Sequence, residues 1–234
     1  MQERSPITRI NPLYSIAKRL LDIGLGSILL VVSTPIILLA AIAICLDSKG
    51  NPFFVQTRLG LGCKPFRIFK LRGMYIDAKQ RFPELYDYTK CNGLDFYFHH
   101  RHDPRITRVG AFTRLSSIDE LPNFLNVVMG DMSLIGPRPE IPDVMALYGD
   151  EYMAKYLSVK PGVTCLSKIS GRDRLTKEES IRFDLDYVDR MSFGLDVAIL
   201  WTTFKSVVLR RNVCNGQDTS KSSDILVAAD SDAD

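Results

Sequence analysis

The sequence predicts an α+β chain that is mainly helical, in which a membrane-embedded helix-break-helix element precedes a cytosolic domain with a small β-hairpin and interfacial amphipathic helices. Three observations predict this class. A run from Ile23 to Leu46 carries no charged residue, two short alternating segments flank a glycine-rich turn, and later segments repeat apolar residues at helical spacing. Hydrophobic residues make up 46% and charged residues 24%, which is typical of a folded domain.

The apolar run is long enough to enter a membrane. A straight helix over Ile23–Leu46 would reach about 36 Å, against a hydrocarbon core of about 30 Å. Pro35 at its centre removes one helical hydrogen bond. The run is therefore either a kinked single span or a re-entrant hairpin broken at Thr34-Pro35. Lys and Arg residues flank it on both sides, as expected if both ends face the cytosol.

We expect four segments along the chain. These are an N-terminal cytosolic or interfacial segment (1–22), the re-entrant helix hairpin (23–46), a cytosolic catalytic domain (47–211) and a disordered tail (212–234). The formal net charge is +3. This moderate excess does not require a nucleic-acid partner, because anionic lipid or a phosphorylated substrate would fit it equally well.

Two segments predict the hairpin, and others predict helices. Residues 52–60 and 65–74 alternate like strands around a turn rich in glycine. Further along, Leu121, Leu125 and Val128 share one face of a predicted helix.

The C-terminal third predicts two more helices. Thr176 and Glu179 have the spacing of a capping box, and the helix they open carries an apolar face of Ile181, Leu185 and Val188. The next helix has an apolar stripe opposite Asp196. The residues of this stripe are Val197, Trp201, Phe204 and Val208. The helix is either a core helix with a basic end or a helix in the headgroup plane with Trp201 at the interface.

Asp119 and Glu120 are the first candidates for chemistry. Pro122 is best tolerated in a first helical turn, so both carboxylates should lie at or just before a helix N-terminus. The helix dipole there favours the ionised form, so an anionic Asp119 with a lowered pKa could serve as a nucleophile or a Mg²⁺ ligand. The alternative is purely structural, because Ser117 and Glu120 also have capping-box spacing.

Several basic residues could bind phosphate. Arg138 lies between two prolines, which restrict the backbone and reduce the entropy lost when its guanidinium binds an anion. Arg114, Lys70 and Arg72 are further candidates. Each of these could equally be a solvated surface charge.

The histidines and cysteines give weaker indications. The three histidines could suggest a metal, but no acidic or cysteine partner has ligand spacing, so a polar loop is favoured at His99, His100 and His102. The five cysteines contain no C-x-x-C pair, which indicates reduced thiols.

An ordered series of motifs resembles a known family. The series is D-P-R-I-T from Asp103, D-E-L-P from Asp119, G-D-M-S from Gly130 and G-P-R-P from Gly136. The likeness extends from about Lys18 to Arg211. On these motifs the chain resembles the bacterial sugar transferases, the small monotopic phosphoglycosyl transferases.

The resemblance implies a reaction and a location. Such enzymes transfer a sugar 1-phosphate from a UDP-sugar to a polyprenyl phosphate such as undecaprenyl phosphate and release UMP, which initiates the synthesis of exopolysaccharide, capsule or another glycoconjugate. It also implies a re-entrant hairpin in the bacterial inner membrane, contact with membrane lipid, and a catalytic domain that faces the cytosol. No nucleic acid is expected as a partner, and a homodimer is left open.

The resemblance also implies roles for residues. Asp119 would attack the sugar-proximal phosphorus to form a covalent aspartyl phosphosugar, and Glu120 would help to hold Mg²⁺ or organise the site. Basic side chains would neutralise phosphate charge, and an aspartate would complete the substrate site; these residues are Lys70, Arg72, Arg114, Arg138 and Asp184.

Two stretches depart from the family's pattern. Leu71-Arg72-Gly73-Met74 stands where F-R-T-M is usual, and residues 164–168 read T-C-L-S-K where T-G-x-x-Q is common. These changes could tune substrate choice or weaken activity. The alternative hypothesis is a catalytically inactive membrane-anchored scaffold with the same fold.

Overall fold

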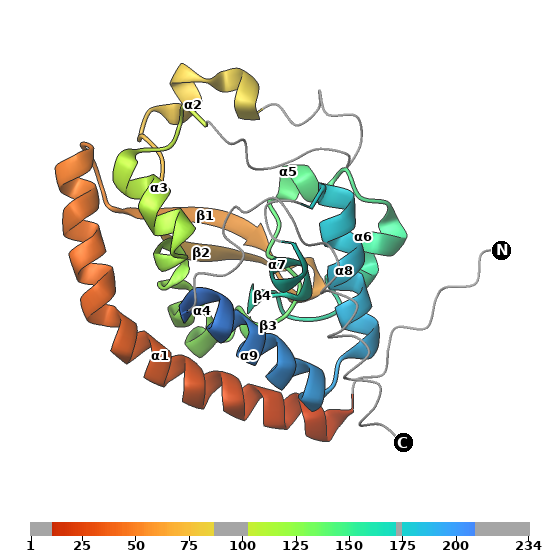
Figure 1. Cartoon of the computed structure of the whole chain (residues 1–234). Coiled ribbons are helices and arrows are strands. Elements are labelled where there is room, and N and C mark those ends of the chain that lie inside the picture. The colour runs from red at the N-terminus through yellow and green to blue at the C-terminus, as the bar shows by residue number, and fades with distance from the viewer. Residues whose placement is uncertain (1–10, 87–102, 172–174, 209–234) are drawn as a thin grey trace.

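The computed structural model describes residues 11–86, 103–171 and 175–208, and its helices surround two small two-stranded sheets (Figure 1). The predicted mainly helical α+β class is confirmed. Predictions for the histidine cluster and for the tail after Arg211 fall outside the described residues.

Helix α1 (Pro12–Asp47) contains the whole apolar run. It is one continuous helix that begins before the run and passes through Pro35, so the predicted break at Thr34-Pro35 is not present. The helix is instead curved along its length (Figure 1). The hydroxyls of Ser33 and Thr34 donate to the Leu30 carbonyl at 3.2 and 2.8 Å. These polar groups are therefore satisfied inside the helix, which lets it continue past a proline in an apolar medium.

The predicted β-hairpin is confirmed. Strands β1 (Phe53–Leu59) and β2 (Pro65–Leu71) pair antiparallel from Phe53–Leu71 to Leu59–Pro65. A single 3₁₀ turn, η1 (Leu61–Cys63), joins them. Gly62 adopts a positive φ of 65° there, a conformation that glycine reaches without steric cost.

A second sheet escaped the sequence analysis. Strands β3 (Ser133–Ile135) and β4 (Gly162–Thr164) form a parallel pair. A Cβ added to Gly136 would lie 2.3 Å from the Lys160 carbonyl oxygen, so the two backbones approach as only glycine allows. Strands of three residues are too short to show a two-residue period, which explains why the pattern missed them.

Short helices connect these sheets. The longest of them, α3, begins at the Thr107 side chain, which accepts a hydrogen bond from the Gly110 amide. The other connections include two 3₁₀ turns. In chain order the elements are α2 (Ala78–Arg81), η2 (Pro83–Tyr86), α3 (Arg108–Leu115), η4 (Ile118–Glu120), α4 (Asn123–Met129), α5 (Pro142–Met145), α6 (Asp150–Tyr156) and α7 (Leu166–Ser170).

Helix α4 buries a different face from the one that apolar spacing suggested. Leu125 is exposed, whereas Asn126 and Val127 are fully buried. The Asn126 side chain donates to the Arg67 carbonyl at 2.7 Å and accepts from the Phe69 amide at 3.1 Å. These bonds compensate for burying an amide and attach α4 to β2.

The last two helices confirm one prediction and resolve another. The capping box of Thr176 and Glu179 opens α8 (Lys177–Arg190), whose predicted apolar face is buried. In α9 (Phe193–Val208) the predicted stripe is exposed at Val197, Trp201 and Phe204, while Asp196 points inward. The stripe therefore does not face the core.

The main core lies between the hairpin, the second sheet and the C-terminal helices. Its fully buried members come from β2, α4, β3, α7, α8 and α9, and from the turn between α4 and β3, which contributes Met132. They include Ile68, Val127, Met132, Leu134, Ile135, Leu166, Tyr187, Val188, Leu195 and Ile199.

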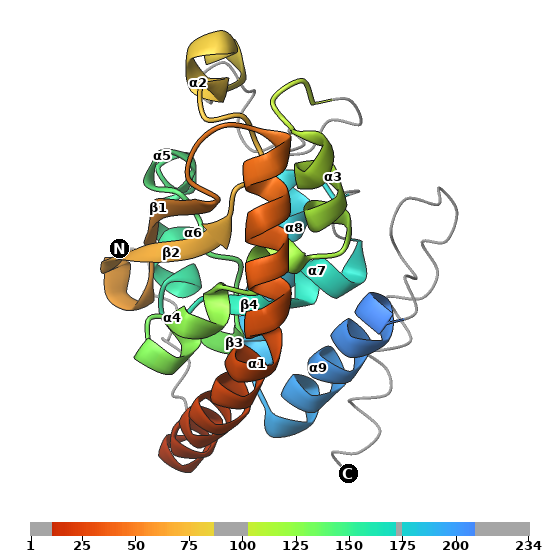
Figure 2. The same ribbon diagram turned by 90° about the vertical axis from the view of Figure 1, so that its left-hand side faces the viewer.

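Both ends of α1 contact this domain. Near its start, Lys18 pairs with Asp196 at 2.7 Å, and the buried Asp22 accepts the Leu134 amide at 2.8 Å. At its end, Asp47 accepts the Val109 amide at 2.9 Å. The helix therefore lies along the domain rather than projecting from it, as Figure 2 shows.

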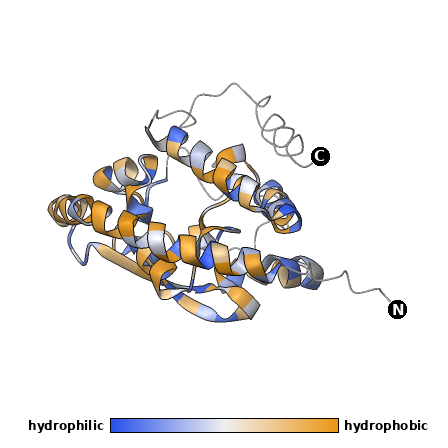
Figure 3. Ribbon diagram, turned by 90° about the horizontal axis from the view of Figure 1, so that it is seen from below, coloured by the Kyte–Doolittle hydropathy of each residue, from blue (hydrophilic) through white to orange (hydrophobic). Residues whose placement is uncertain are grey.

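The outer face of α1 is apolar and exposed. It has the length and hydropathy of a helix that could cross a membrane. Helix α9 lies on the same side of the molecule, and apolar residues recur along both helices in the view from below (Figure 3). The exposed apolar residues of the two helices include Leu20, Ile28, Val31, Val32, Leu38, Leu39, Ile42, Val197, Trp201 and Phe204. Such a surface is suited to contact with lipid.

Candidate active site

Asp119 and Glu120 form the 3₁₀ turn η4 between α3 and α4. Ser117 precedes the turn with a positive φ of 57°, and Pro122 is the N-cap residue of α4. The prediction that both carboxylates lie just before a helix N-terminus is confirmed. The alternative capping role of Ser117 is not realised, because its side chain makes no cap hydrogen bond.

Glu120 is held by two lysines from different elements. Lys70 in β2 places its Nζ 3.2 Å from Oε1 of Glu120, and Lys168 in α7 pairs with Oε2. Burial alone would raise the pKa of Glu120, but the charges of Lys168 and Lys70 hold that pKa well below its usual range. Glu120 is therefore an ionised anchor for both ammonium groups.

Asp119 has a different environment. In the described part of the chain no hydrogen bond or ion pair engages its carboxylate, and the side chain is half-buried. Burial and then the charge of Glu120 raise its pKa, despite the opposing charges of nearby basic groups. The lowered pKa predicted for Asp119 is wrong; within this pair the lowered pKa belongs to Glu120. The reason is that burial disfavours the charged form of Asp119, and that the negative charge which Glu120 retains beside the lysines also opposes its ionisation.

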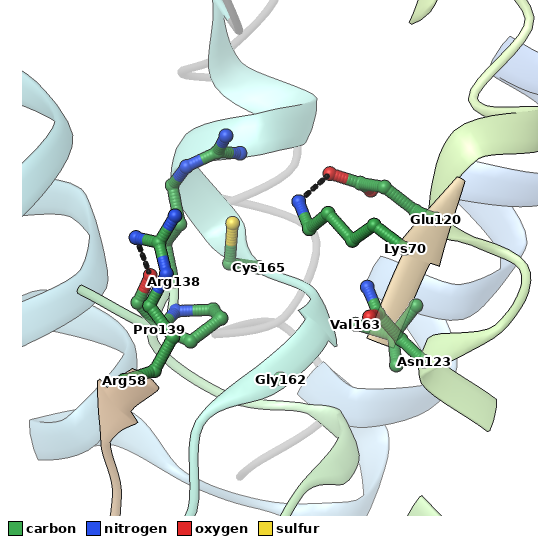
Figure 4. A pocket seen from close by; sticks show the side chains of 9 residues that line it. All are labelled: Arg58, Lys70, Glu120, Asn123, Arg138, Pro139, Gly162, Val163 and Cys165. Atoms are coloured by element: carbon green, nitrogen blue, oxygen red, sulfur yellow. Dashed lines mark hydrogen bonds and ion pairs between the residues drawn. The ribbon is translucent and has the colours of Figure 1, made fainter. Parts of the chain in front are cut away.

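A pocket opens beside this pair (Figure 4). Arg58 and Arg138 stand on one wall, Lys70 and Glu120 lie opposite, and Cys165 lies between them. Arg58 donates to the Pro139 carbonyl at 3.0 Å, which ties the hairpin to the G-P-R-P loop. Three cationic side chains around one cavity favour an anionic ligand such as a phosphate. The complete lining is Arg58, Lys70, Glu120, Asn123, Arg138, Pro139, Gly162, Val163 and Cys165.

Asp184 supports the pocket from behind. It is fully buried in α8, and its carboxylate accepts the Arg138 amide at 2.8 Å and the Ser167 amide at 3.1 Å. The Tyr156 hydroxyl donates to the same carboxylate at 3.1 Å. Burial raises the pKa of Asp184. This placement gives Asp184 a role in orienting the Arg138 loop, and it is not among the residues that line the pocket.

Two predicted phosphate-binding arginines lie away from the pocket lining. Arg72 is buried and donates to the Ser48 and Lys49 carbonyls at 2.7 and 2.5 Å, so it fixes the chain that leaves α1. Arg114 lies in α3, where its charge acts on Asp119 and its Nε lies against Gly73. Arg114 therefore belongs to the electrostatic surroundings of the carboxylate pair.

Four residues of this site were not predicted as site residues: Arg58, Asn123, Cys165 and Lys168. Arg58 belongs to the basic residues that follow the apolar run, and no motif marks Asn123. Cys165 and Lys168 were noted only as departures from the family's pattern. No local pattern marks these residues, because the cavity is assembled from segments far apart in the chain.

The metal-binding capacity of the site is limited. Among the described residues, no three His, Cys, Asp or Glu side chains cluster as a metal site would require. Mg²⁺ nevertheless often takes one or two carboxylates together with substrate phosphates. Each oxygen of Glu120 pairs with a lysine, whereas Asp119 has no such partner among the described residues, so Asp119 is the carboxylate that would fit the ion more readily.

Comparisons with known proteins show which sequences this chain is similar to. The chain is 39% identical over 197 residues to the galactosyl transferase CpsE of Streptococcus agalactiae, covering 84% of this chain and 43% of the relative. It is 37% identical to a UDP-glucose:undecaprenyl-phosphate glucose-1-phosphate transferase of Caulobacter vibrioides. That match covers 88% of this chain and 74% of the relative. It is 36% identical to an undecaprenyl-phosphate galactose phosphotransferase of Salmonella typhimurium. That match covers 83% of this chain and 41% of the relative.

The chain spans less than half the length of the Streptococcus and Salmonella relatives. The profile of one family nevertheless matches residues 13–210, which includes α1, the hairpin, the carboxylate pair and both C-terminal helices. The chain therefore belongs to the bacterial sugar transferase family.

Proposed function

We propose that this chain transfers a sugar 1-phosphate from a UDP-sugar to a polyprenyl phosphate such as undecaprenyl phosphate and releases UMP. The observation that carries the proposal is a pocket lined by Arg58, Lys70 and Arg138 together with Glu120, the residue directly after Asp119. Relatives named as undecaprenyl-phosphate sugar phosphotransferases support the substrate class. The reaction would begin the assembly of an exopolysaccharide, capsule or other glycoconjugate.

The chemistry proceeds in two displacements. A carboxylate oxygen of Asp119 attacks the sugar-proximal phosphorus of the donor, the phosphoanhydride bond breaks, and UMP leaves with the electron pair. An oxygen of the polyprenyl phosphate then attacks the same phosphorus and displaces Asp119. A raised pKa favours this role, because a more basic oxygen is the stronger nucleophile once it is ionised.

The cationic wall has its role in the same steps. Arg58 and Arg138 face Lys70 across the cavity, where they neutralise the diphosphate and the charge that develops on the leaving UMP. Asp119 and the donor phosphates would hold a Mg²⁺ ion, which adds positive charge to the diphosphate. Asp184 keeps the Arg138 backbone in position.

The membrane arrangement follows from where the two substrates are found. A nucleotide sugar is dissolved in the cytosol, and a polyprenyl phosphate has its charged end at the headgroup level. We infer that α1 is re-entrant in the inner membrane, with both ends on the cytosolic side. Polar residues near both ends of α1 bond to the one domain, which supports this topology over a span.

The nucleophile can be tested with the donor alone. Purified protein incubated with a UDP-sugar, Mg²⁺ and no acceptor should gain the mass of a phosphosugar on the peptide that contains Asp119. The Asp119→Asn variant should show no adduct and lose at least about a thousandfold in UMP release. The matched control is Asp143→Asn, which removes an exposed carboxylate in α5 and should retain activity.

The same experiment separates the alternatives. Equal UMP release from the wild type and Asp119→Asn would contradict the nucleophile. Release of UDP instead of UMP would indicate a glycosyl transferase. An inactive scaffold would give no product from any donor. The open Asp119 and the cationic pocket favour the enzyme over the scaffold.

A further inference from the structure

Lys168 has no explanation in the reaction described so far. It stands where glutamine is common in the family, and its ammonium group pairs with Oε2 of Glu120. Lys70 pairs with the other oxygen, Oε1, at 3.2 Å. The side chains of both lysines and of Glu120 are at most 17% exposed, so water contributes little to solvating any of these charges.

This arrangement gives the two carboxylates different partners. Each oxygen of Glu120 already faces an ammonium group, so a cation at Glu120 would either meet two positive charges or displace a lysine, and loss of a partner from a shielded ion pair is costly. Asp119, one residue earlier, has no such bond within the described chain. An acidic pair that looks symmetric in the sequence is therefore asymmetric in the fold.

We propose that Lys168 is a positioning residue. Together with Lys70, it keeps Glu120 out of the coordination sphere of a divalent cation. Asp119 then remains as the carboxylate of the pair that is open to the metal. The inference rests on the proposed function for the identity of the site. It concerns how this chain holds its cation, and it makes Lys168 a built-in counter-charge to Glu120.

The test measures cation binding without any substrate. Mn²⁺ serves as the probe and is followed by electron paramagnetic resonance with the purified full chain in lipid nanodiscs. Lys168→Gln introduces the neutral residue common in the family, and Lys168→Met removes the hydrogen-bond donor altogether. We expect either variant to bind Mn²⁺ about tenfold more tightly, because Glu120 becomes available as a ligand. Lys168→Arg keeps the charge and should retain the wild-type affinity.

A double-mutant cycle separates ligand release from simple charge removal. If loss of positive charge were the whole cause, Lys168→Gln would tighten Mn²⁺ binding equally with and without Glu120. Release of Glu120 as a ligand instead confines the gain to the chain that has Glu120, so in a Glu120→Gln background we expect Lys168→Gln to change the affinity by less than about twofold. An equal gain in both backgrounds would contradict the proposal.

Two further outcomes would also overturn it. One is an unchanged Mn²⁺ affinity in both Lys168 variants with a lowered Tm, which would make Lys168 a structural link between α7 and η4. The other is the absence of Mn²⁺ binding from every variant. Failure of the proposed function is distinguishable, because it would appear as a wild type that releases no UMP from any donor.

Discussion

Cys165 shows how the pocket changes the chemistry of a single residue. Its thiol lines the cavity between cationic walls, yet it is buried beside Asp184 and contacts the Ser167 hydroxyl at 3.2 Å. Burial, and then the charge of Asp184, raise the pKa of Cys165 to about 12. Since the thiolate is the reactive form, this thiol should be nearly inert at neutral pH.

Pulsed alkylation tests this expectation. At pH 8, a shift from 9.0 to about 12 reduces the thiolate fraction about a thousandfold. We expect N-ethylmaleimide to modify Cys165 at least that much more slowly than the exposed Cys63, and the Cys165 rate to rise about tenfold per pH unit up to pH 10. Peptide mass spectrometry gives both rates. Comparable rates for the two cysteines would show that the pocket does not shield the thiol.

The carboxylate pair also shows where residue-level reasoning stops. The sequence predicted the position of Asp119 and Glu120 before a helix, because Pro122 restricts where such a helix can begin. It did not predict their different pKa shifts, because these depend on Lys70 and Lys168, which lie 50 and 48 residues away. Charge partners at such distances are invisible to local pattern analysis.

At the scale of elements, the first half of α1 is a structural part of the domain. Asp22 is buried against β3, where its Oδ1 accepts the Ser133 hydroxyl at 3.0 Å and the Leu134 amide at 2.8 Å. Arg19 donates to the Val127 and Val128 carbonyls at the end of α4. Because β3 leads directly into the G-P-R-P loop, these bonds help to fix the wall of the pocket that carries Arg138.

Removal of this link should destabilise the fold. Asp22→Ala leaves the buried Leu134 amide without its partner, which costs about 1–3 kcal/mol. We expect Tm to fall by several degrees in a thermal unfolding experiment on the detergent-solubilised protein.

Glu178→Ala is the matched control. It removes an exposed carboxylate whose partner is Arg182, one turn along α8, and should change stability by no more than about 0.5 kcal/mol. Equal Tm values for the two variants would show that α1 contributes nothing to the stability of the domain through Asp22.

At the scale of the whole molecule, the exposed apolar surface of α1 and α9 and the pocket belong to one folded unit. Helix α1 bends around the domain, and its start and end both bond to it (Figure 1). Helix α9, whose Trp201 is exposed, lies on the same side of the molecule as α1 (Figure 3). If the domain is cytosolic, both ends of α1 must be cytosolic as well.

Cysteine labelling in intact cells tests this topology. With the native cysteines outside the core replaced by serine, Ser15→Cys and Lys49→Cys place single exposed thiols near the two ends of α1. An impermeant maleimide should modify neither in intact cells and both after permeabilisation. Labelling of Ser15→Cys alone from outside would indicate a through-span.

Much of the fold was accessible from local patterns. The hairpin follows from alternation around Gly62, α8 follows from its capping box, and α1 follows from the uncharged run. The short parallel sheet and the buried face of α4 were not accessible. Strands of three residues have no readable period, and Asn126 is buried only because two backbone groups of β2 satisfy its amide.

The sequence by itself determined an apolar helix with basic flanks, a hairpin, and an acidic pair followed by a proline-bounded arginine, because these depend on neighbours within a few residues. Only the tertiary structure decided that both ends of α1 contact one domain. It also decided which residues reach the site: Arg72 and Asp184 support the fold, whereas Arg58 and Lys168 lie at the site. Finally, it decided that Glu120 is paired while Asp119 is open. The physical reason is that burial and charge pairing act through space between segments that folding brings together.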